Sequence, residues 1–182
     1  NYISFVDELL HVKRKTTEHF EIQDYELMTF DSLSDLYDEL KKREELHGLS
    51  RLVAGYSWPW ASKNDKNAID IEIDGLQFQW NQTEKDWVNS PTAFLEVGSI
   101  HTIQGYDLNY TGVIFGREID YDYKTGKIVV NPKMYFDAYG KNGIKNIDDL
   151  KAYIINIYKT IMYRGIKGTF IYACNEGLRN YL

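Results

Sequence analysis

The chain has 182 residues, of which 43% are hydrophobic and 15% aromatic, and this composition excludes an intrinsically disordered protein. A formal net charge of -6 excludes recognition of nucleic acid through an overall positive field, so any contact with a polyanion has to be local. A single cysteine, Cys174, excludes an internal disulfide, and the absence of a signal-peptide pattern or long apolar run predicts an intracellular, cytoplasmic protein with no membrane contact.

The first part of the chain predicts a helix followed by a strand–helix–strand unit. Apolar residues at helical spacing indicate a helix from residue 3 to about residue 10 or 12. A short strand is expected over 26–30. The next helix starts at Ser32, a residue type that caps helices, and it stops at Gly48 before a strand over 51–56.

Two antiparallel hairpins are predicted from alternating apolar and polar residues. The first joins 69–74 to 76–80 through the two-residue turn Asp74-Gly75. The second joins 119–123 to 128–130 through a turn that contains a glycine. We expect Trp80 and Trp87 to pack around the first hairpin.

The last part of the chain predicts two strands that are buried in a sheet and a long helix between them. The apolar run 113–115 is typical of a strand covered on both faces. A helix capped by Asn146 is apolar on two faces and leads to a strand over 169–173, after which a short helix is expected. We therefore predict an α/β fold, with a mainly parallel sheet flanked by helices on both faces and two added hairpins.

Neither a metal site nor a nucleophile is indicated by the residue types that usually provide one. The acidic residues of the hairpins are expected on their solvent faces, because alternation alone puts them there. These residues are Asp70, Glu72, Asp120 and Asp122. The spacing of the remaining potential ligands does not match a zinc site. They are His11, His19, His47 and Cys174.

Two stretches of the chain hold the residues with the clearest functional potential. In one, a Gln104-Gly105 turn and Asp107 follow a short apolar strand, where backbone N–H groups can face an anionic ligand. In the other, an apolar helix ends at Arg164. The residues alone also allow simpler explanations: Asp107 caps a turn, and Arg164 interacts with the carboxyl end of its helix.

A resemblance to a known family connects these stretches. Two segments match the fifth and sixth motifs of superfamily 1 helicases in order and context: Ser99-x-His101-x-x-Gln104-Gly105-x-Asp107 and Arg164-Gly165-Ile166-Lys167-Gly168. With the segment Trp58-Pro59-Trp60, which precedes both motifs in the same order, nearly the whole chain resembles the Schlafen group 3-like DNA/RNA helicase family.

The resemblance implies a second RecA-like domain of the P-loop NTPase type, which here forms one C-terminal domain over 1–182. In such a motor, ATP with magnesium lies between two RecA-like domains. The chain contains no phosphate-binding loop and no strand that ends in Asp-Glu, so the first domain is expected elsewhere in a larger parent protein. A Gln-x-Arg motif is expected just upstream of residue 1. By itself this chain is expected to bind no cofactor and to be inactive as an ATPase.

The resemblance also implies roles for single residues at the nucleotide. Arg164 is the catalytic arginine that neutralises charge on the transferred phosphoryl group. Gln104 and Gly105 approach the phosphates, and Asp107 accepts a hydrogen bond from a ribose hydroxyl. Tyr163 departs from the family, in which threonine commonly precedes the arginine.

The nucleic-acid contacts that the resemblance implies involve single-stranded DNA or RNA. Ser99 and His101 would contact the backbone, although a strand serine and a core histidine are the ordinary alternatives. Trp58 and Trp60 offer rings for base stacking with Lys63 nearby, but we expect one of the two rings to belong to the core.

A second function is compatible with the same residues. The acidic balance and the departure at Tyr163 would also suit a non-catalytic α/β domain that binds nucleic acid or a protein on a helicase-like scaffold. An intact phosphate loop in the parent protein would favour the motor, and a degraded one would favour the binding domain.

Overall fold

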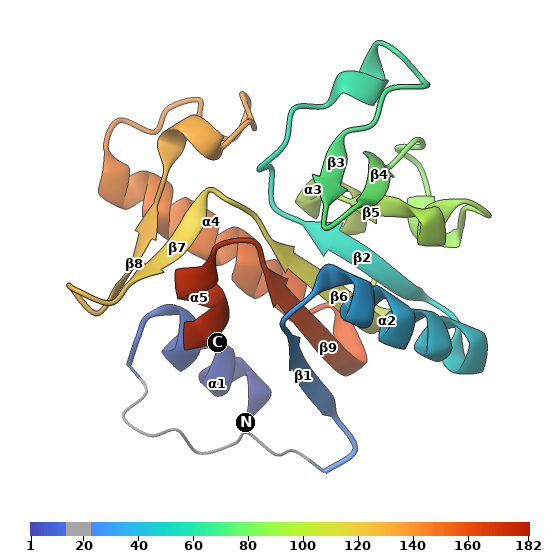
Figure 1. Ribbon diagram of the computed structural model, residues 1–182, viewed down its shortest axis with the longest axis horizontal. Coiled ribbons are helices and arrows are strands. Elements are labelled where there is room, and N and C mark those ends of the chain that lie inside the picture. Colours follow the sequence, from blue (N-terminus) through green and yellow to red (C-terminus); the bar gives the residue numbers. More distant parts are fainter. Residues whose placement is uncertain (14–22) are drawn as a thin grey trace.

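The computed structural model describes residues 1–13 and 23–182 (Figure 1). Within these residues one sheet contains β1 (Glu26–Phe30), β2 (Ser50–Ala54), β3 (Ile71–Ile73), β4 (Leu76–Trp80), β5 (Glu96–Gly98), β6 (Leu108–Phe115) and β9 (Gly165–Ala173). The order across this seven-stranded sheet is β1-β9-β6-β2-β5-β4-β3, and all neighbours are parallel except β3 and β4. A separate antiparallel hairpin is formed by β7 (Ile119–Asp122) and β8 (Lys127–Val130).

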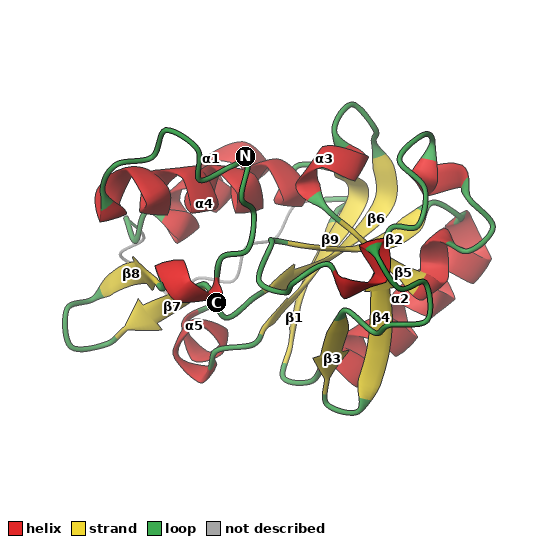
Figure 2. Cartoon of the chain, turned by 90° about the horizontal axis from the view of Figure 1, so that it is seen from above, coloured by secondary structure: helices red, strands yellow, loops and turns green. Residues whose placement is uncertain are grey.

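Helices cover both faces of the sheet, as Figure 2 shows from above. They are α1 (Tyr2–Leu10), α2 (Leu33–His47), α3 (Ile100–Ile103), α4 (Ile147–Met162) and α5 (Glu176–Tyr181). Strand β6 shows why both faces are buried. Val113 and Phe115 belong to the core under α1 and α4, whereas Ile114 between them packs with the residues of α2. The predicted α/β fold with a mainly parallel sheet is therefore confirmed.

The two long helices begin where their predicted caps lie. The backbone N–H of Asp35 donates to Ser32 Oγ over 3.1 Å, and that of Asp149 donates to Asn146 Oδ1 over 2.8 Å. Helix α2 ends at Gly48, whose φ of 66° suits a residue without a side chain. The predicted strands 113–115 and 169–173 are longer in the structure, because β6 and β9 also pair at their amino ends, where Leu108 meets Gly165 and Tyr110 meets Gly168.

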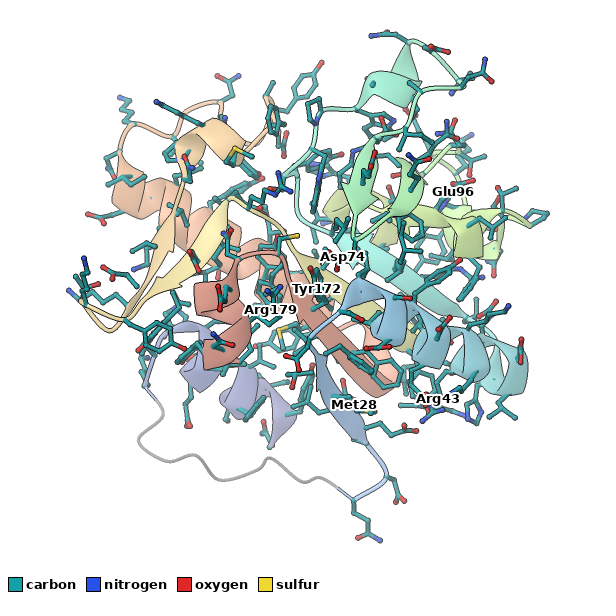
Figure 3. All side chains as sticks on the ribbon, in the orientation of Figure 1. Met28, Arg43, Asp74, Glu96, Tyr172 and Arg179 are labelled. Carbon is teal, nitrogen blue, oxygen red and sulfur yellow. The ribbon has the colours of Figure 1, made fainter. Side chains whose placement is uncertain are left out.

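Helix α2 is fastened to the edge of the sheet by an arginine. Arg43, labelled in Figure 3, donates from Nη2 to Glu26 Oε2 over 2.6 Å and also lies 2.8 Å from Glu39. The hydrogen bonds from Arg43 hold the pKa of Glu26 below its ordinary value. Helix α2 and edge strand β1 are thereby joined by a charged contact as well as by the core.

A second fastening lies at the carboxyl end of β9, where Figure 3 shows Asp74, Tyr172 and Arg179 close together. The Tyr172 hydroxyl donates to Asp74 Oδ2 over 3.3 Å, and the Arg179 guanidinium lies 5.4 Å from the centre of the Tyr172 ring. Arg179 also donates to the carbonyl oxygen of Ala173 over 2.6 Å. These contacts join the β3–β4 turn and α5 to the carboxyl end of β9.

The first hairpin differs from the prediction, because it extends the main sheet instead of being added to it. Strand β4 pairs in parallel with β5, which the sequence analysis did not predict. Strand β5 has three residues and lies between a short turn of 3-10 helix and α3, so it shows no alternation to recognise. Trp80 and Trp87 are fully buried beside this hairpin, which confirms their predicted packing.

Two acidic residues of the hairpins lie differently from the prediction. Asp70 is buried, and its carboxylate accepts hydrogen bonds from the backbone N–H groups of Ser62 and Trp80, each over 2.8 Å. The solvent-face prediction is wrong there, because Asp70 lies at the base of the hairpin, where it satisfies two buried donors. Asp120 is half-buried and accepts from the backbone N–H of Leu178 in α5 over 2.9 Å.

Of the other two acidic residues, Glu72 is exposed as predicted. Asp122 is half-buried, like Asp120, and accepts a hydrogen bond from Thr125 over 2.8 Å in the β7–β8 turn. No group of three or more potential metal ligands occurs within 1–13 and 23–182, and His19 lies outside these described residues. No helix in the described parts of the chain combines the length and apolarity needed to cross a bilayer.

Candidate functional site

The predicted functional residues lie at two opposite ends of the parallel strands. Strands β2, β5, β6 and β9 run in the same direction, so their amino ends share one edge of the sheet and their carboxyl ends share the other. Ser99 and His101 follow the carboxyl end of β5. Helix α3 then returns the chain to the amino end of β6, which Gln104 and Asp107 precede.

Arg164 lies at the amino end, between α4 and β9. Its Nε donates to the carbonyl oxygen of Thr160 over 3.3 Å, and its Nη1 donates to that of Tyr106 over 3.5 Å. The same nitrogen lies 3.9 Å from Asp107 Oδ1. The Arg164 side chain is 25% exposed and that of Asp107 is 70% exposed. The guanidinium therefore contacts the last turn of its helix, as the simpler explanation predicts, and also lies against the Gln104–Asp107 turn.

The turn itself is open to solvent. Gln104, Gly105 and Asp107 are all exposed. Gly105 has a φ of 88°, and a Cβ built on it would have no atom within 4 Å. Glycine is therefore required here by the backbone conformation and not by crowding within the chain.

At the carboxyl end, the two predicted backbone contacts have different environments. Ser99 is 1% exposed, and its hydroxyl lies 2.9 Å from Thr102 Oγ1, which in turn donates to Asn81 Oδ1 over 2.7 Å. Ser99 is therefore an internal serine, which was the ordinary alternative to a nucleic-acid contact. In this conformation its hydroxyl cannot reach a ligand. The His101 side chain is 55% exposed, with Nε2 3.5 Å from Asp137 Oδ2, so it is not a core histidine.

The two predicted stacking rings are also distinct. Trp58 is buried, with its ring centre 6.4 Å from that of Trp80 in an edge-on arrangement, so Trp58 is the one that belongs to the core. Trp60 is half-buried, with its ring centre 6.4 Å from that of Tyr56. The exposed Lys63 lies with its Nζ 6.0 Å from the Trp60 ring. Trp60 and Lys63 together present a ring and a positive charge at the surface.

Comparison with known proteins decides the family. A family model described as Schlafen group 3, DNA/RNA helicase domain matches residues 1–175. The chain belongs to this Schlafen group 3 helicase family. The uncharacterized protein YPL245W of Saccharomyces cerevisiae is 31% identical over 169 residues, which are 88% of this chain and 37% of that protein. The chain thus spans little more than a third of that relative's length. No solved structure matches the chain.

In this member of the Schlafen group 3 family, a buried carboxyl group between the strand ends and α4 escaped the sequence analysis. Glu118 is fully buried and accepts a hydrogen bond from the Tyr158 hydroxyl, which also accepts one from the backbone N–H of Gly116 over 2.9 Å. The backbone N–H of Glu118 donates to Ser57 Oγ over 3.2 Å. Burial raises the pKa of Glu118.

Two glycines mark this buried group in the sequence. A Cβ on Gly55 would overlap the Tyr158 hydroxyl and Glu118, and one on Gly116 would overlap Glu118 and Ser57. Each glycine directly follows a strand of the sheet, β2 or β6. A glycine immediately after a buried strand is therefore the signal that could have indicated a close approach here.

The single cysteine does not add a nucleophile to either end of this helicase-family domain. Cys174 follows β9, and burial raises the pKa of its thiol to about 12. The thiol therefore stays protonated at neutral pH, and the protonated form is a poor nucleophile.

Proposed function

We propose that this chain is the second RecA-like domain of an ATP-dependent superfamily 1-type DNA/RNA helicase or translocase. In this proposal a P-loop domain of the same parent protein binds ATP with magnesium, and the present domain supplies the second wall of the nucleotide site. Membership of the helicase-domain family supports the proposal, as does the 37% coverage of the yeast relative, which leaves room for further domains in that protein.

The observation that carries the proposal is the position of Arg164 against the Tyr106–Asp107 turn. Its guanidinium is held by two carbonyl oxygens and one exposed carboxylate, so it keeps hydrogen-bonding capacity for a ligand. In phosphoryl transfer, an arginine from a neighbouring domain neutralises charge on the transferred group and accelerates the reaction by about 10³ to 10⁵. The partial exposure of Arg164 and its position against the Tyr106–Asp107 turn support this role.

The neighbouring residues have complementary roles in the proposal. Gly105 lets the backbone come close to the phosphates, Gln104 approaches them with its amide, and Asp107 accepts from a ribose hydroxyl. Magnesium would be held by the P-loop domain, because the described residues of this chain contain no cluster of potential metal ligands. Without that domain we expect no ATP hydrolysis by residues 1–182.

Nucleic-acid binding is assigned to the carboxyl end of the sheet. His101, Trp60 and Lys63 are at least partly exposed there and offer a donor, a ring and a positive charge. Trp58 and Ser99 are buried, so we assign them the supporting role of holding this surface in place. Single-stranded DNA or RNA is the expected partner.

The decisive experiment measures ATP hydrolysis by the full-length parent protein that carries Arg164→Ala. We expect turnover to fall by about 10³ or more with folding retained, and we expect Arg164→Lys to restore little, because lysine lacks the planar fork of donors. Arg117→Ala is a control at a second arginine, since Arg117 is exposed and its side chain makes no hydrogen bond or ion pair within the described residues. Near-normal turnover in folded Arg164→Ala would refute the arginine's role.

The non-catalytic alternative makes the opposite prediction for the wild-type protein. A binding domain on a helicase-like scaffold would retain single-stranded nucleic acid while the parent protein hydrolyses no ATP under any condition. The structure gives Tyr163 a local reason, since its hydroxyl donates to the Ile3 carbonyl oxygen over 3.4 Å and its ring meets that of Tyr2 edge-on. The departure at Tyr163 is thus explained by packing between α1 and α4 and does not by itself favour loss of activity.

A further inference from the structure

The segment 131–146 stands out from the rest of the chain by its charge. It contains three lysines and one aspartate, so its formal charge is +2 in a chain whose net charge is -6. The aspartate, Asp137, is 5% exposed, whereas Lys133 and Lys145 are exposed. At the surface this segment is therefore almost purely basic, which meets the requirement that any contact with a polyanion be local.

The same segment exposes two aromatic rings. Phe136 is 41% exposed and Tyr139 is 88% exposed, although large aromatic side chains usually seek burial. Tyr135 beside them is 1% exposed. The chain thus buries one ring as an anchor and leaves the next ones in solvent.

Buried polar contacts hold these exposed rings in a defined place. Asp137 accepts from the backbone N–H of Gly140 over 2.8 Å and from the Tyr135 hydroxyl over 3.3 Å. A Cβ on Gly140 would overlap the Asp137 carboxylate, so the turn closes tightly on that residue. The segment is consequently an ordered part of the surface, and ordering lowers the entropic cost of binding.

Segment 131–146 lies next to two residues already assigned to nucleic acid, Trp60 through Tyr56 and His101 directly. The backbone N–H of Phe136 donates to the Tyr56 carbonyl oxygen over 2.7 Å, and the Tyr56 ring centre lies 6.4 Å from that of Trp60. Asp137 in turn lies 3.5 Å from His101. Figure 1 shows segment 131–146 and the Trp60–Lys63 region at the same end of the sheet, on the upper left and upper right of the view.

We propose that segment 131–146 forms a second half of the single-strand path, in which Phe136 and Tyr139 stack on bases and Lys133 and Lys145 contact phosphates. This inference rests on the proposed nucleic-acid contact at Trp60 and Lys63 and extends it across the carboxyl end of the sheet. Aromatic rings combined with positive charges are the pattern that binds single strands without sequence preference. A double strand would not expose its bases to these rings.

The test measures binding of fluorescein-labelled oligo-dT and oligo-rU of about 20 nucleotides to residues 1–182 by anisotropy, at several salt concentrations. We expect the Phe136→Ala, Tyr139→Ala double variant to bind at least about fivefold more weakly. Tyr123→Ala is the matched control, because Tyr123 is 60% exposed in the β7–β8 turn, at the end of β8 opposite to the start of segment 131–146, and it should leave affinity unchanged.

Charge is tested separately by the salt dependence of binding. Replacing Lys133 and Lys145 by Glu should reduce the slope of log affinity against log salt by about 1.4, because each lost phosphate contact with a single strand removes about 0.7. The matched pair Lys124→Glu and Lys127→Glu, on the β7–β8 hairpin, should change the slope much less. Circular dichroism and thermal unfolding would verify that every variant is folded.

The outcomes distinguish this inference from the function on which it rests. If Trp60→Ala weakens binding while the variants of segment 131–146 behave like their controls, the inference is refuted and the proposed function stands. If the segment variants weaken binding and Trp60→Ala does not, the segment is supported and the assignment of Trp60 fails. If wild-type protein binds neither oligonucleotide, the inference and the proposed nucleic-acid contact are both refuted. The exposed rings would then be better explained as a binding surface for a protein.

Discussion

The carboxylate of Asp107 and the guanidinium of Arg164 meet at the amino end of the sheet, with 3.9 Å between Oδ1 and Nη1. They come from the approach to β6 and from the end of α4, and the pairing of Leu108 with Gly165 brings these two segments together. Because the Asp107 side chain is 70% exposed, such a pair contributes little to folding. The exposure of the Asp107 carboxylate leaves it accessible to a ligand.

This relationship predicts that Asp107→Ala affects nucleotide binding and not stability. Urea unfolding should change by no more than about 0.5 kcal/mol. In the full-length protein the KM for ATP should rise by about tenfold or more with kcat retained, since a hydrogen bond to an ionised acceptor contributes about 1.5–3 kcal/mol. Glu84→Ala, at an exposed position, should change neither quantity. An unchanged KM in Asp107→Ala would remove the ribose contact.

A pair of glycine variants separates backbone strain from ligand approach. Gly105 and Gly75 have φ values of 88° and 81°, and neither would have an atom within 4 Å of an added Cβ. Alanine at either position should therefore cost a similar free energy of unfolding, about 1–2 kcal/mol. Only Gly105→Ala should also raise the KM for ATP of the full-length protein. Equal kinetic effects of the two variants would show that Gly105 has no special role at the phosphates.

Two buried tryptophans predict unequal costs of the same substitution. The indole N–H of Trp87 donates to Glu96 Oε2 over 2.8 Å, whereas that of Trp80 has no hydrogen-bond partner in the part of the chain that the structure describes. Both rings are fully buried, so Trp→Phe removes a similar volume at each position. Trp87→Phe should be the more destabilising by about 1–3 kcal/mol, because it leaves a buried carboxylate oxygen short of a donor. Urea unfolding measures the difference, and equal costs would contradict the bond's contribution.

The buried Glu118 predicts a pH dependence of stability with a defined sign. Its pKa is raised above the ordinary value of 4.5 because burial disfavours the charged form. The folded state therefore binds this proton more tightly than the unfolded state, and the associated stability is complete below about pH 4.5 and is lost as the pH rises through the folded-state pKa.

The Glu118→Gln variant isolates this effect, since the amide oxygen can still accept from the Tyr158 hydroxyl. The difference in unfolding free energy between variant and wild type should shift in favour of the variant as the pH rises above about 4.5, by up to about 1.4 kcal/mol for each pH unit. Subtracting the two curves cancels the other titrating groups. A difference that is flat between pH 4 and pH 8, about the range in which most domains stay folded, would contradict the raised pKa.

Much of the fold could be predicted from local signals. Helix α2 was recognisable from the Ser32 cap and from Gly48 at its end, and both features occur where they were expected. Strand β5 and the burial of Asp70 were not recognisable, because a three-residue strand has no period and because alternation places an acidic residue outside unless buried donors need it.

The contacts within the candidate site could not be predicted from local sequence patterns. The proximity of Arg164 and Asp107 was suggested only by resemblance, because their contact depends on which strands become neighbours. The contact of His101 with Asp137 had no sequence signal, since the two residues lie in separate loops that meet only at the carboxyl edge. Long-range contacts between loops cannot be inferred from periodicity, which reports only on each element by itself.

Helix α4 connects the two ends of the sheet at which the candidate site residues lie. It is a single uninterrupted helix of 16 residues, about 24 Å long, with the basic segment 131–146 leading into its amino end and Arg164 just beyond its carboxyl end. Tyr158, in the last third of α4, ties the helix to the ends of the strands, so a small tilt about this point would displace the two ends of the helix in opposite directions, the amino end by more. Under the proposed function, such a tilt would couple segment 131–146, the proposed half of the single-strand path, to Arg164.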